Sequence, residues 1–349
     1  MKVYMDNSAT TPVFPEAIAE MVACMQEGFG NPSSIHAFGR DAYNRLDKAR
    51  SQVANLINAE KEEIYFTSGG TEADNIALQG IASRYETGHI ITSSIEHPAV
   101  KETCEHLAKQ GYAITYLPVD HSGRVNPADV KKAIRPDSIL ISIMHANNEV
   151  GSVQPVEEIG KIAQEAGIPF HVDAVQSLGK IEVDVEKMGV SLLTISSHKI
   201  NGPKGSGALY VRRGTKINRI VYGGGQEHKL RSGTENMPGI VGFGKAAELT
   251  AQNWQEHAKY TRELSNYLMD RLVKEVPDLT INGSREHRLP HNIHISIAYI
   301  EGEAILLYLD MAGIAVSSGS ACSSGTEEPS HVLKAMGLPA EQMQSAIRM

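Results

Sequence analysis

Short apolar runs rich in β-branched residues alternate with amphipathic stretches of helical length over most of the chain. The runs have the length of strands, and Ile, Val, Thr and Tyr are typical of strands. Because strands separated by helices are joined by crossover connections, this order predicts an α/β fold with a mainly parallel seven-stranded sheet and helices on both faces. The expected strands lie at residues 63–68, 89–94, 113–119, 138–145, 169–175, 192–197 and 207–213.

The pattern changes beyond about residue 250, where a long helical stretch is followed by short strands and another helix. With 349 residues, of which 41% are hydrophobic, the chain has enough apolar material for one large domain and a smaller one. We therefore expect a large α/β domain at residues 15–250 and a small α+β domain built from residues 1–14 and 251–349.

The charge balance argues against nucleic acid as a general partner. Lys and Arg number 33 against 41 Asp and Glu, a formal net charge of -8, so no overall basic field would attract a polyanion. No run of about 18 apolar residues occurs, and the first residues lack the apolar stretch of a signal peptide. We expect a cytoplasmic protein without a membrane span.

The three cysteines are far apart and form no CxxC pair, which argues against a disulfide framework and a four-thiolate zinc site. Cys24 and Cys104 fall in stretches of helical periodicity, so we expect both to be buried structural residues. Cys322 stands instead in SSGSACSSG, among serines and glycines that favour exposed turns and mobile loops. Either Cys322 belongs to a surface linker, or its movement has a function.

Three histidines close together, His287, His291 and His294, raise the question of a metal site. Pro290 interrupts the stretch, and the alternation that follows indicates a strand with side chains on both of its faces. Ligands on opposite faces do not converge on one ion, so a metal is not expected here.

Polar residues collect where three of the expected strands end, which is the edge at which open parallel sheets bind ligands. Residues 68–71 precede a helix whose free N–H groups suit a phosphate, although the same residues also form an ordinary helix cap. Asp173 ends a buried strand with Gln176 in the next turn, and it either meets a cationic partner or caps the turn. Lys199 follows another strand, where a lysine is unusual.

Together, these three strand ends supply a phosphate cradle, a carboxylate and an amine. The set suits pyridoxal 5'-phosphate (PLP), whose phosphate would bind at the helix start, whose ring nitrogen would face Asp173 and whose aldehyde would react with Lys199. A carboxylate against the ring nitrogen keeps that nitrogen protonated, so that the ring withdraws electrons. Burial lowers the pKa of a lysine toward the neutral amine that an imine requires.

The motifs, taken in order, resemble those of the NifS/IscS-like cysteine desulfurases, which belong to the class V aminotransferase group and have PLP fold type I. Each motif alone is only moderately specific, but ten of them follow one another along almost the whole chain. They are YMDNSATTP, GNPSSIH, TSGGTEADN, EHPAV, ANNEVG, HVDAVQ, SSHKINGPKGSGALYV, RSGTEN, RLPHN and SSGSACSSGTEEPSHVLKAMG.

The resemblance implies a role in cofactor binding for several of these residues. Lys199 would form the imine, Asp173 would pair with the ring nitrogen, and Gln176 would donate to the ring hydroxyl. His97 would stack on the ring and assist proton transfer. The phosphate would be held by Thr71, Ser196 and His198, with the backbone of Gly70 nearby.

The same resemblance implies contacts to the substrate and to a second subunit. Asn147, which would also lie beside the cofactor, and Arg348 would bind the substrate carboxylate. Thr234 would reach the phosphate in the other subunit of a homodimer. Family members usually continue beyond AIRM, so we expect the small domain to be truncated and Arg348 to lie on a frayed end.

In this family, a cysteine thiolate attacks the sulfur of a cofactor-bound L-cysteine, which leaves L-alanine and a persulfide. Cys322 matches that residue, and a Ser/Gly loop would let it pass the sulfur to an acceptor such as an iron–sulfur scaffold protein. The expected function is therefore a PLP-dependent cysteine desulfurase that supplies iron–sulfur cluster assembly or other thio-cofactors. The alternatives are a selenocysteine lyase or related sulfur lyase on the same fold, or a non-catalytic sulfur-transfer partner.

Overall fold

The computed structural model of the chain describes residues 2–318 and 329–349, so Cys322 lies outside the described residues. The longer helices are α1 (Pro15–Gln26), α2 (Ala37–Leu56), α3 (Gly70–Ala82), α4 (Pro98–Lys109), α6 (Val156–Ala166), α7 (Met237–Glu275) and α8 (Gly302–Met311). The shorter ones are α5 (Pro127–Ala133), α9 (His331–Ala335), α10 (Ala340–Gln344) and the 3-10 turns η1 (Lys61–Glu63), η2 (Ser197–Lys199) and η3 (Glu227–Lys229).

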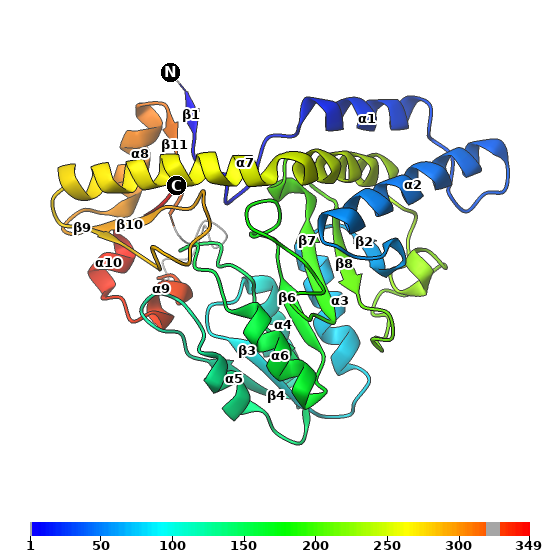
Figure 1. Ribbon diagram of the computed structural model, residues 1–349, viewed down its shortest axis with the longest axis horizontal. Coiled ribbons are helices and arrows are strands. Elements are labelled where there is room, and N and C mark those ends of the chain that lie inside the picture. Colours follow the sequence, from blue (N-terminus) through cyan, green and yellow to red (C-terminus); the bar gives the residue numbers. More distant parts are fainter. Residues whose placement is uncertain (1, 319–328) are drawn as a thin grey trace.

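Seven strands form a central sheet, and each lies within a stretch that the sequence predicts as a strand. They are β2 (Ile64–Thr67), β3 (His89–Ser93), β4 (Ala113–Leu117), β5 (Ser138–Ser142), β6 (Phe170–Asp173), β7 (Leu192–Ser196) and β8 (Gly207–Val211). Their order is β2-β8-β7-β6-β5-β3-β4 (Figure 1). All neighbours from β7 to β4 are parallel, whereas β8 is antiparallel to both β2 and β7. The expected mainly parallel α/β sheet is confirmed.

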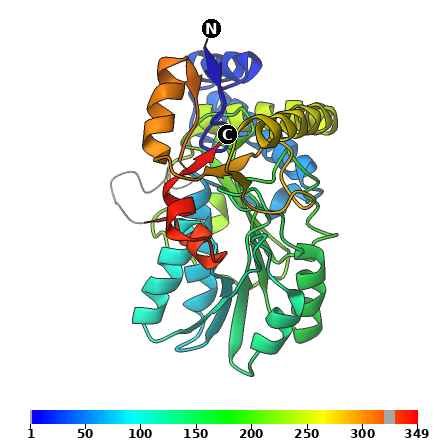
Figure 2. The ribbon, with the colours of Figure 1, turned by 90° about the vertical axis from the view of Figure 1, so that its left-hand side faces the viewer.

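Adjacent residues of the central strands point to opposite faces of the sheet, as the period of two in a strand requires. Ile90 and Leu192 pack with residues of α3 and α4, whereas Ile91 and Leu193 pack on the other face with residues of α2, α6 and α7. Figure 2 shows helices on both sides of the sheet. Buried on both faces, these strands read in the sequence as continuous apolar runs.

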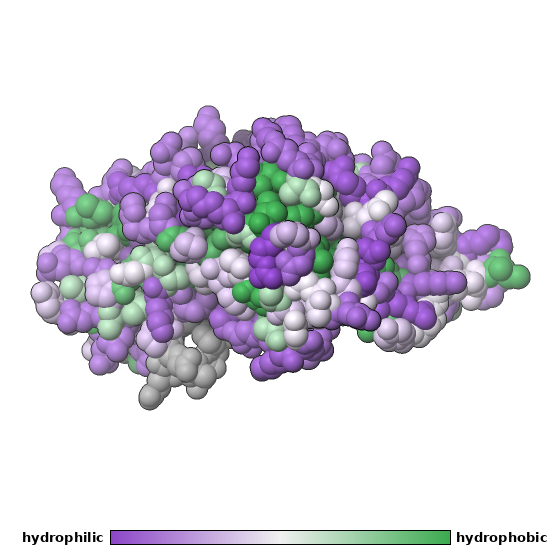
Figure 3. Space-filling view, turned by 90° about the horizontal axis from the view of Figure 1, so that it is seen from below, coloured by the Kyte–Doolittle hydropathy of each residue, from purple (hydrophilic) through white to green (hydrophobic). Residues whose placement is uncertain are grey.

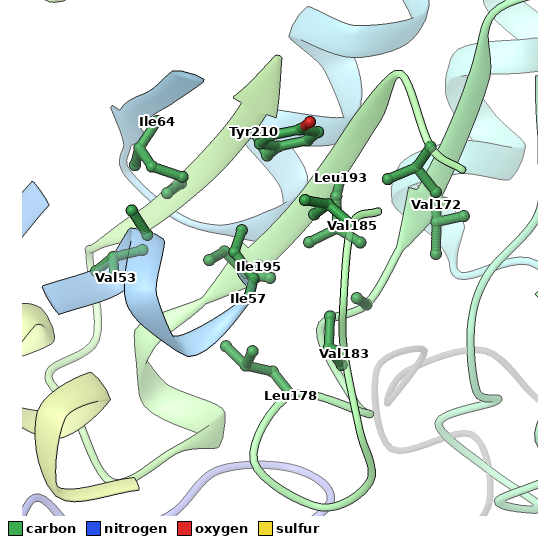
Figure 4. Close-up of a cluster of buried hydrophobic side chains, with 14 of the residues drawn as sticks. Val53, Ile57, Ile64, Val172, Leu178, Val183, Val185, Leu193, Ile195 and Tyr210 are labelled. Carbon is green, nitrogen blue, oxygen red and sulfur yellow. The ribbon is translucent and has the colours of Figure 1, made fainter. Parts of the chain in front are cut away.

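The larger hydrophobic cluster lies on the face covered by α2 and α7. Figure 4 shows part of it, where Val53 of α2 and Ile57, the residue after that helix, meet Leu193 and Ile195 of β7. All four side chains are fully buried, and each contributes about 1.5–3 kcal/mol by leaving water. The substitution Leu193→Ala would leave a cavity and lower the free energy of unfolding by about 2–5 kcal/mol.

Helix α7 begins well before the start that the sequence pattern indicates, which was residue 253. Its first turns contain Gly239, Gly242 and Gly244, and glycine weakens a helix by about 1 kcal/mol relative to alanine. The glycines permit close packing, since a Cβ at Gly244 would lie 2.6 Å from the Cα of Ala49 in α2. The close packing of α7 against α2 therefore outweighs the low helix propensity of these glycines. Helix α7 passes through residue 250, and the expected domain division at that point stays a prediction.

A second, three-stranded sheet has the order β12-β10-β9 and is antiparallel throughout. Its strands are β9 (Leu279–Ile281), β10 (His294–Ile297) and β12 (Ala346–Arg348). Beside it, β1 (Val3–Tyr4) pairs in parallel with β11 (Ile314–Ala315), so the two ends of the chain meet. Figures 1 and 2 show β1, α8 and the C-terminus at the same end of the molecule.

The expectation that Arg348 lies on a frayed end is wrong. Arg348 pairs with His294 in the ladder between β12 and β10, and its backbone also bridges to Ser317. Its side chain is 1% exposed. Strand pairing on both sides thus fixes a residue that the sequence leaves one position from the end of the chain.

Both cysteines of the described part of the chain are buried, as the sequence predicts. Cys24 in α1 and Cys104 in α4 are free thiols, and each lies inside a hydrophobic cluster, one on either face of the central sheet. Burial raises the pKa of Cys104 to about 12, so this thiol is not a nucleophile at neutral pH. Over the residues that the structure describes, no helix combines the length and apolar character needed to cross a bilayer.

Candidate active site

A cavity of about 220 Å³ lies at the carboxyl ends of β6 and β7, beside the start of α3. Eight of the residues singled out in the sequence line it together, although they come from distant parts of the chain. They are Gly70, Thr71, His97, Asp173, Gln176, Ser196, His198 and Lys199. The other lining residues are Ala9, Asp74, Met144, Asn148 and Val175.

Lys199 enters the cavity because η2 follows directly on β7 and turns the chain back over the strand end. Its Nζ donates to the backbone carbonyls of Ser8 at 2.5 Å and Ala9 at 2.8 Å. Gln176 donates from Nε2 to the Ser8 carbonyl at 2.9 Å. The N-terminal segment therefore forms one wall of the cavity and sets the position of the amine.

Asp173 is the last residue of β6 and is 6% exposed. One carboxylate oxygen accepts the backbone N–H of Val175 at 2.9 Å, which fixes the side chain at the strand end. Burial raises the pKa of Asp173 to about 6, while the Val175 N–H and the charge of Lys199 act to lower it. A nearby cation, such as a protonated ring nitrogen, would stabilise the carboxylate further.

The turn between β2 and α3 needs its glycines. Gly69 has φ +155°, a conformation that residues with a side chain rarely adopt. A Cβ at Gly70 would lie 2.8 Å from the Val175 side chain, so only glycine lets this turn approach the end of β6. The backbone N–H groups at the start of α3 thus face a cavity that a side chain at position 70 would obstruct, an arrangement that suits a phosphate.

Two histidines of the cavity are neutral at pH 7. Burial, together with the charge of Lys199, lowers the pKa of His97 and of His198 to about 4. His97 caps α4, where its Nδ1 accepts the N–H of Ala99 at 3.1 Å, so its Nε2 carries the proton. His198 Nδ1 lies 3.1 Å from the Thr10 hydroxyl.

Of two adjacent asparagines, the structure places the second in the cavity and not the first, which the sequence analysis selected. Asn147 is fully buried, and its side chain donates to the Ile95 carbonyl and accepts the N–H groups of Glu149 and Val150. Asn148 lines the cavity, and its buried Oδ1 has no hydrogen-bond partner. Both asparagines follow β5, and only the turn geometry that Asn147 holds could have distinguished them.

Arg348 and Thr234 do not line this cavity in the single chain. The Arg348 guanidinium donates to the Asn148 carbonyl at 3.0 Å and to the Asp6 carboxylate at 2.9 Å, which places it next to the cavity. Thr234 is exposed in the turn before α7. The structure therefore brings Arg348 near the site through Asn148 and leaves Thr234 at the surface.

The residues of the cavity fit PLP. Hydroxyl and imidazole groups surround the N–H groups at the start of α3, where they suit a phosphate. Asp173 supplies a carboxylate for a ring nitrogen, and Lys199 supplies an amine for an aldehyde. A second cavity of about 460 Å³ near Arg213 and His228 is lined by none of the residues that the sequence analysis selected for cofactor binding.

Comparison with known proteins agrees with this fit. The chain matches the family described as Aminotransferase class-V over residues 3–349, and it therefore belongs to this family. It is 52% identical to Cysteine desulfurase IscS of Dictyoglomus turgidum, over 99% of this chain and 89% of the relative. The expected family is confirmed.

Two solved structures resemble the whole chain. One, described as a NifS-like protein, has a TM-score of 0.94 and 40% identity, and the match covers 100% of this chain and 93% of that chain. The other, described as SspA in complex with cysteine, has a TM-score of 0.88 and 37% identity, and the match covers 100% of this chain and 98% of that chain. The likeness therefore extends to the fold as a whole.

Proposed function

We propose that this chain is a PLP-dependent cysteine desulfurase that converts L-cysteine to L-alanine and retains the sulfur as a persulfide. The observation that carries the proposal is the meeting of Lys199, Asp173 and the start of α3 around one cavity. Relatives of about 50% identity carry this activity in their names, and one structural neighbour is described as a complex with cysteine. Class V aminotransferases and cysteine desulfurases depend on PLP.

When bound, PLP supplies an electron-withdrawing ring that stabilises negative charge on the α-carbon of the amino acid. Asp173 is proposed to hold the ring nitrogen in its protonated form, because a buried carboxylate beside it favours the cation. Gln176 is proposed to donate to the ring hydroxyl from its place beside Ser8. Thr71, Ser196 and His198 are proposed to bind the phosphate with the backbone of Gly70.

Lys199 is proposed both to anchor the cofactor and to move the proton of the substrate α-carbon. Its Nζ donates to the carbonyls of Ser8 and Ala9 in the N-terminal segment that forms one wall of the cavity, so the amine stays within reach of the cavity. His97, neutral and with its proton on Nε2, is proposed to stack on the ring and to assist this transfer.

The substrate carboxylate is proposed to bind between Asn148 and Arg348. Asn148 lines the cavity, and the Arg348 guanidinium contacts the Asn148 backbone, so the two groups adjoin. A planar guanidinium can donate two parallel hydrogen bonds to a carboxylate. Asn147, which the resemblance assigns to the substrate and the cofactor, supports this place indirectly by holding the turn that carries Asn148.

Cys322 is proposed to attack the sulfur of the substrate. Its thiolate forms the new S–S bond, the C–S bond of the substrate breaks, and the electron pair of that bond leaves with the alanine portion, which takes up a proton. The described residues on either side of residues 319–328, the segment that contains Cys322, form hydrogen bonds with other parts of the chain. Ser317 bridges to Arg348, and Ser330 donates to the Glu149 carboxylate at 2.5 Å, so both flanks are anchored to the main body.

A test of this role uses Cys322→Ser with Cys24→Ala as the matched control, since Cys24 is buried in a hydrophobic cluster away from the cavity. We expect Cys322→Ser to keep the visible absorbance of the bound cofactor and to release no alanine from cysteine. Cys24→Ala should retain alanine release. Normal turnover by Cys322→Ser would contradict the proposal, as would the absence of alanine release by the unmodified protein.

We also propose a homodimer in which Thr234 reaches the cofactor phosphate of the partner. The turn between α1 and α2 exposes large apolar side chains, with Ile35 91% exposed and Phe29 stacked on Phe38 of α2 at the surface. Figure 3 shows hydrophobic colour at the right-hand end of the molecule, where Figure 1 places this turn. Exposed apolar groups of this kind mark interfaces. Sedimentation should give a dimer, and Thr234→Ala should weaken cofactor binding.

The acceptor of the sulfur is proposed to be a protein such as an iron–sulfur scaffold, and the compartment the cytoplasm. Two buried free thiols, Cys24 and Cys104, and a persulfide on a third cysteine are all compatible with a reducing compartment. Labelling the protein with radioactive sulfur from cysteine, followed by transfer to a purified scaffold protein, tests the acceptor. Fractionation of the native cell tests the location.

A further inference from the structure

Asp74 is a second buried carboxyl group in the cavity, and the proposed reaction gives it no role. It lies in the first turns of α3, is 1% exposed, and lines the same 220 Å³ cavity as Asp173. Two carboxyl groups that share a small buried cavity repel one another when both are ionised. The charge state of Asp74 therefore affects the group that would face the ring of PLP.

The immediate neighbours of Asp74 are neutral polar groups. Its Oδ1 lies 3.5 Å from His171 Nε2 and has no hydrogen-bond partner, and the Thr194 hydroxyl donates to the carboxyl group. His171 is held by two hydroxyls, with Nδ1 2.8 Å from Ser142 Oγ and Nε2 3.0 Å from Thr194 Oγ1. Among the described residues, no lysine or arginine forms an ion pair with Asp74.

The charged and titratable groups that face Asp74 come from three neighbouring elements. Burial raises the pKa of Asp74 well above its usual range, and the charges of Asp173 from β6 and Glu96 before α4 raise it further. Burial also lowers the pKa of His171 to about 3, so this imidazole is neutral and offers no counter-charge. Lys199, which follows β7, acts on Asp173 instead.

We propose that Asp74 is a positioning residue that keeps its proton at neutral pH, so that the carboxyl pair in the cavity carries one negative charge, on Asp173. The inference rests on the proposed binding of PLP in this cavity. A neutral Asp74 accepts the hydrogen bond from the Thr194 hydroxyl without adding charge to the cavity. It thereby leaves the ring nitrogen a single carboxylate as its partner.

The first measurement uses the protein without cofactor, labelled with ¹³C at aspartate side chains. One carboxyl resonance, identified by its absence in Asp74→Asn, should keep the chemical shift of a protonated acid from pH 5 to pH 8. A resonance at the position of an ionised carboxylate at pH 7 would overturn the proposal. This measurement does not depend on turnover, whereas alanine release by the unmodified protein tests the proposed function separately.

The second measurement compares variants by the dissociation constant for PLP and by the pH titration of its visible absorbance. Asp74→Asn has the shape of a neutral acid and should bind PLP within about threefold of the unmodified protein, with an unmoved titration. Asp74→Ala removes the polar group and should weaken binding by about tenfold, the effect of one lost hydrogen bond. Rescue by Asn but not by Ala is the result expected of a positioning residue.

Asp173→Asn serves as the matched control, because it removes the charge that the proposal assigns to the pair. It should weaken PLP binding by more than about tenfold and shift the absorbance titration. If Asp74→Asn weakened binding as much as Asp173→Asn does, Asp74 would carry charge in the native protein and the proposal would fail. The same conclusion would follow if Asp74→Ala bound PLP as the unmodified protein does.

Discussion

The carboxyl ends of the seven-stranded sheet and the surroundings of the three-stranded sheet bury opposite kinds of charged residue. Around the carboxyl ends of the large sheet lie Asp74, Asp173 and Glu96, all buried carboxyl groups. Beside the small sheet lie Arg288 and Arg348, the two largest side chains that are fully buried in the described part of the chain. One region thus concentrates acids, and the other concentrates guanidinium groups.

The difference has a chemical reason. A buried carboxyl group can take up a proton and lose its charge, whereas an arginine stays charged and must be surrounded by acceptors. Arg288 donates to the backbone carbonyls of Asn282, Ser284 and Asn292. Burial lowers its pKa to about 10, with help from the charges of Arg285 and Arg262, so it remains a cation at pH 7. The large sheet can therefore respond to pH and ligands, while the small sheet is held in one state.

If this contrast is right, changes at the large sheet alter chemistry and changes at the small sheet alter stability. Lys199→Ala should reduce alanine formation by at least about 10²–10⁴-fold, the usual loss when a positioned proton-transfer group is removed. Its free energy of unfolding should change little, because the Ser8 carbonyl, which accepts from Lys199, keeps its hydrogen bond from Gln176 in the variant. Turnover and urea unfolding, measured together, check both parts. A stable variant with normal turnover would break the comparison.

At the small sheet, the largest effect should come from Arg288. Arg288→Ala would leave several buried carbonyl groups without donors, and we expect the free energy of unfolding to fall by about 3 kcal/mol. Arg285→Ala is the matched control, because Arg285 makes an exposed 3.5 Å contact with Asp270, and its loss should change stability by less than about 1 kcal/mol. If urea unfolding showed the same loss of unfolding free energy for both variants, the buried arginine would be no more important for stability than the exposed one.

The adjacent asparagines sharpen the comparison within a single turn. Asn148→Ala removes a cavity group and should raise KM for cysteine by about tenfold with little loss of stability. Asn147→Ala leaves the N–H groups of Glu149 and Val150 unpaired and should lower the free energy of unfolding by about 1–3 kcal/mol. Steady-state kinetics and thermal unfolding of both variants are the measurements. The reverse pattern would restore Asn147 as the substrate residue.

A pH-dependent effect concerns Glu96. Burial raises the pKa of Glu96 to about 8, so between pH 5 and pH 8 the folded protein keeps a proton that the unfolded chain has lost. This proton makes the free energy of unfolding fall as pH rises, by up to about 1.4 kcal/mol per pH unit. Glu96→Gln should flatten that fall in urea unfolding of the protein without cofactor. Exposed Glu102→Gln is the control, and identical slopes for the two variants would contradict the assignment.

The sequence predicts the central sheet well because its strands are buried on both faces and therefore appear as continuous apolar runs. It also predicts the cavity, since Asp173 and Lys199 mark strand ends that a parallel sheet must bring to one edge. It misses the start of α7, because Gly239, Gly242 and Gly244 weaken the helical pattern while the packing against α2 requires them.

Two features of the site could not be predicted from local pattern. Asn147 and Asn148 are the same residue type at adjacent positions, and only the hydrogen bonds of the folded turn separate their roles. Arg348 is one residue from the end of the sequence, and its burial depends on pairing with β10 and on Asp6 at the other end of the chain. Contacts between residues that are far apart in the sequence cannot be predicted from a short stretch of it.

The wall formed by the N-terminal segment has a consequence for synthesis on the ribosome. Val3 and Tyr4 pair with Ile314 and Ala315, which the ribosome adds long after β1. The donors to the Ser8 and Ala9 carbonyls, Gln176 and Lys199, are likewise translated well after residues 8 and 9. The nascent chain can assemble the parallel sheet as it emerges, but this side of the cavity closes only after Ala315 has emerged, so cofactor capture is expected to follow the synthesis of β11.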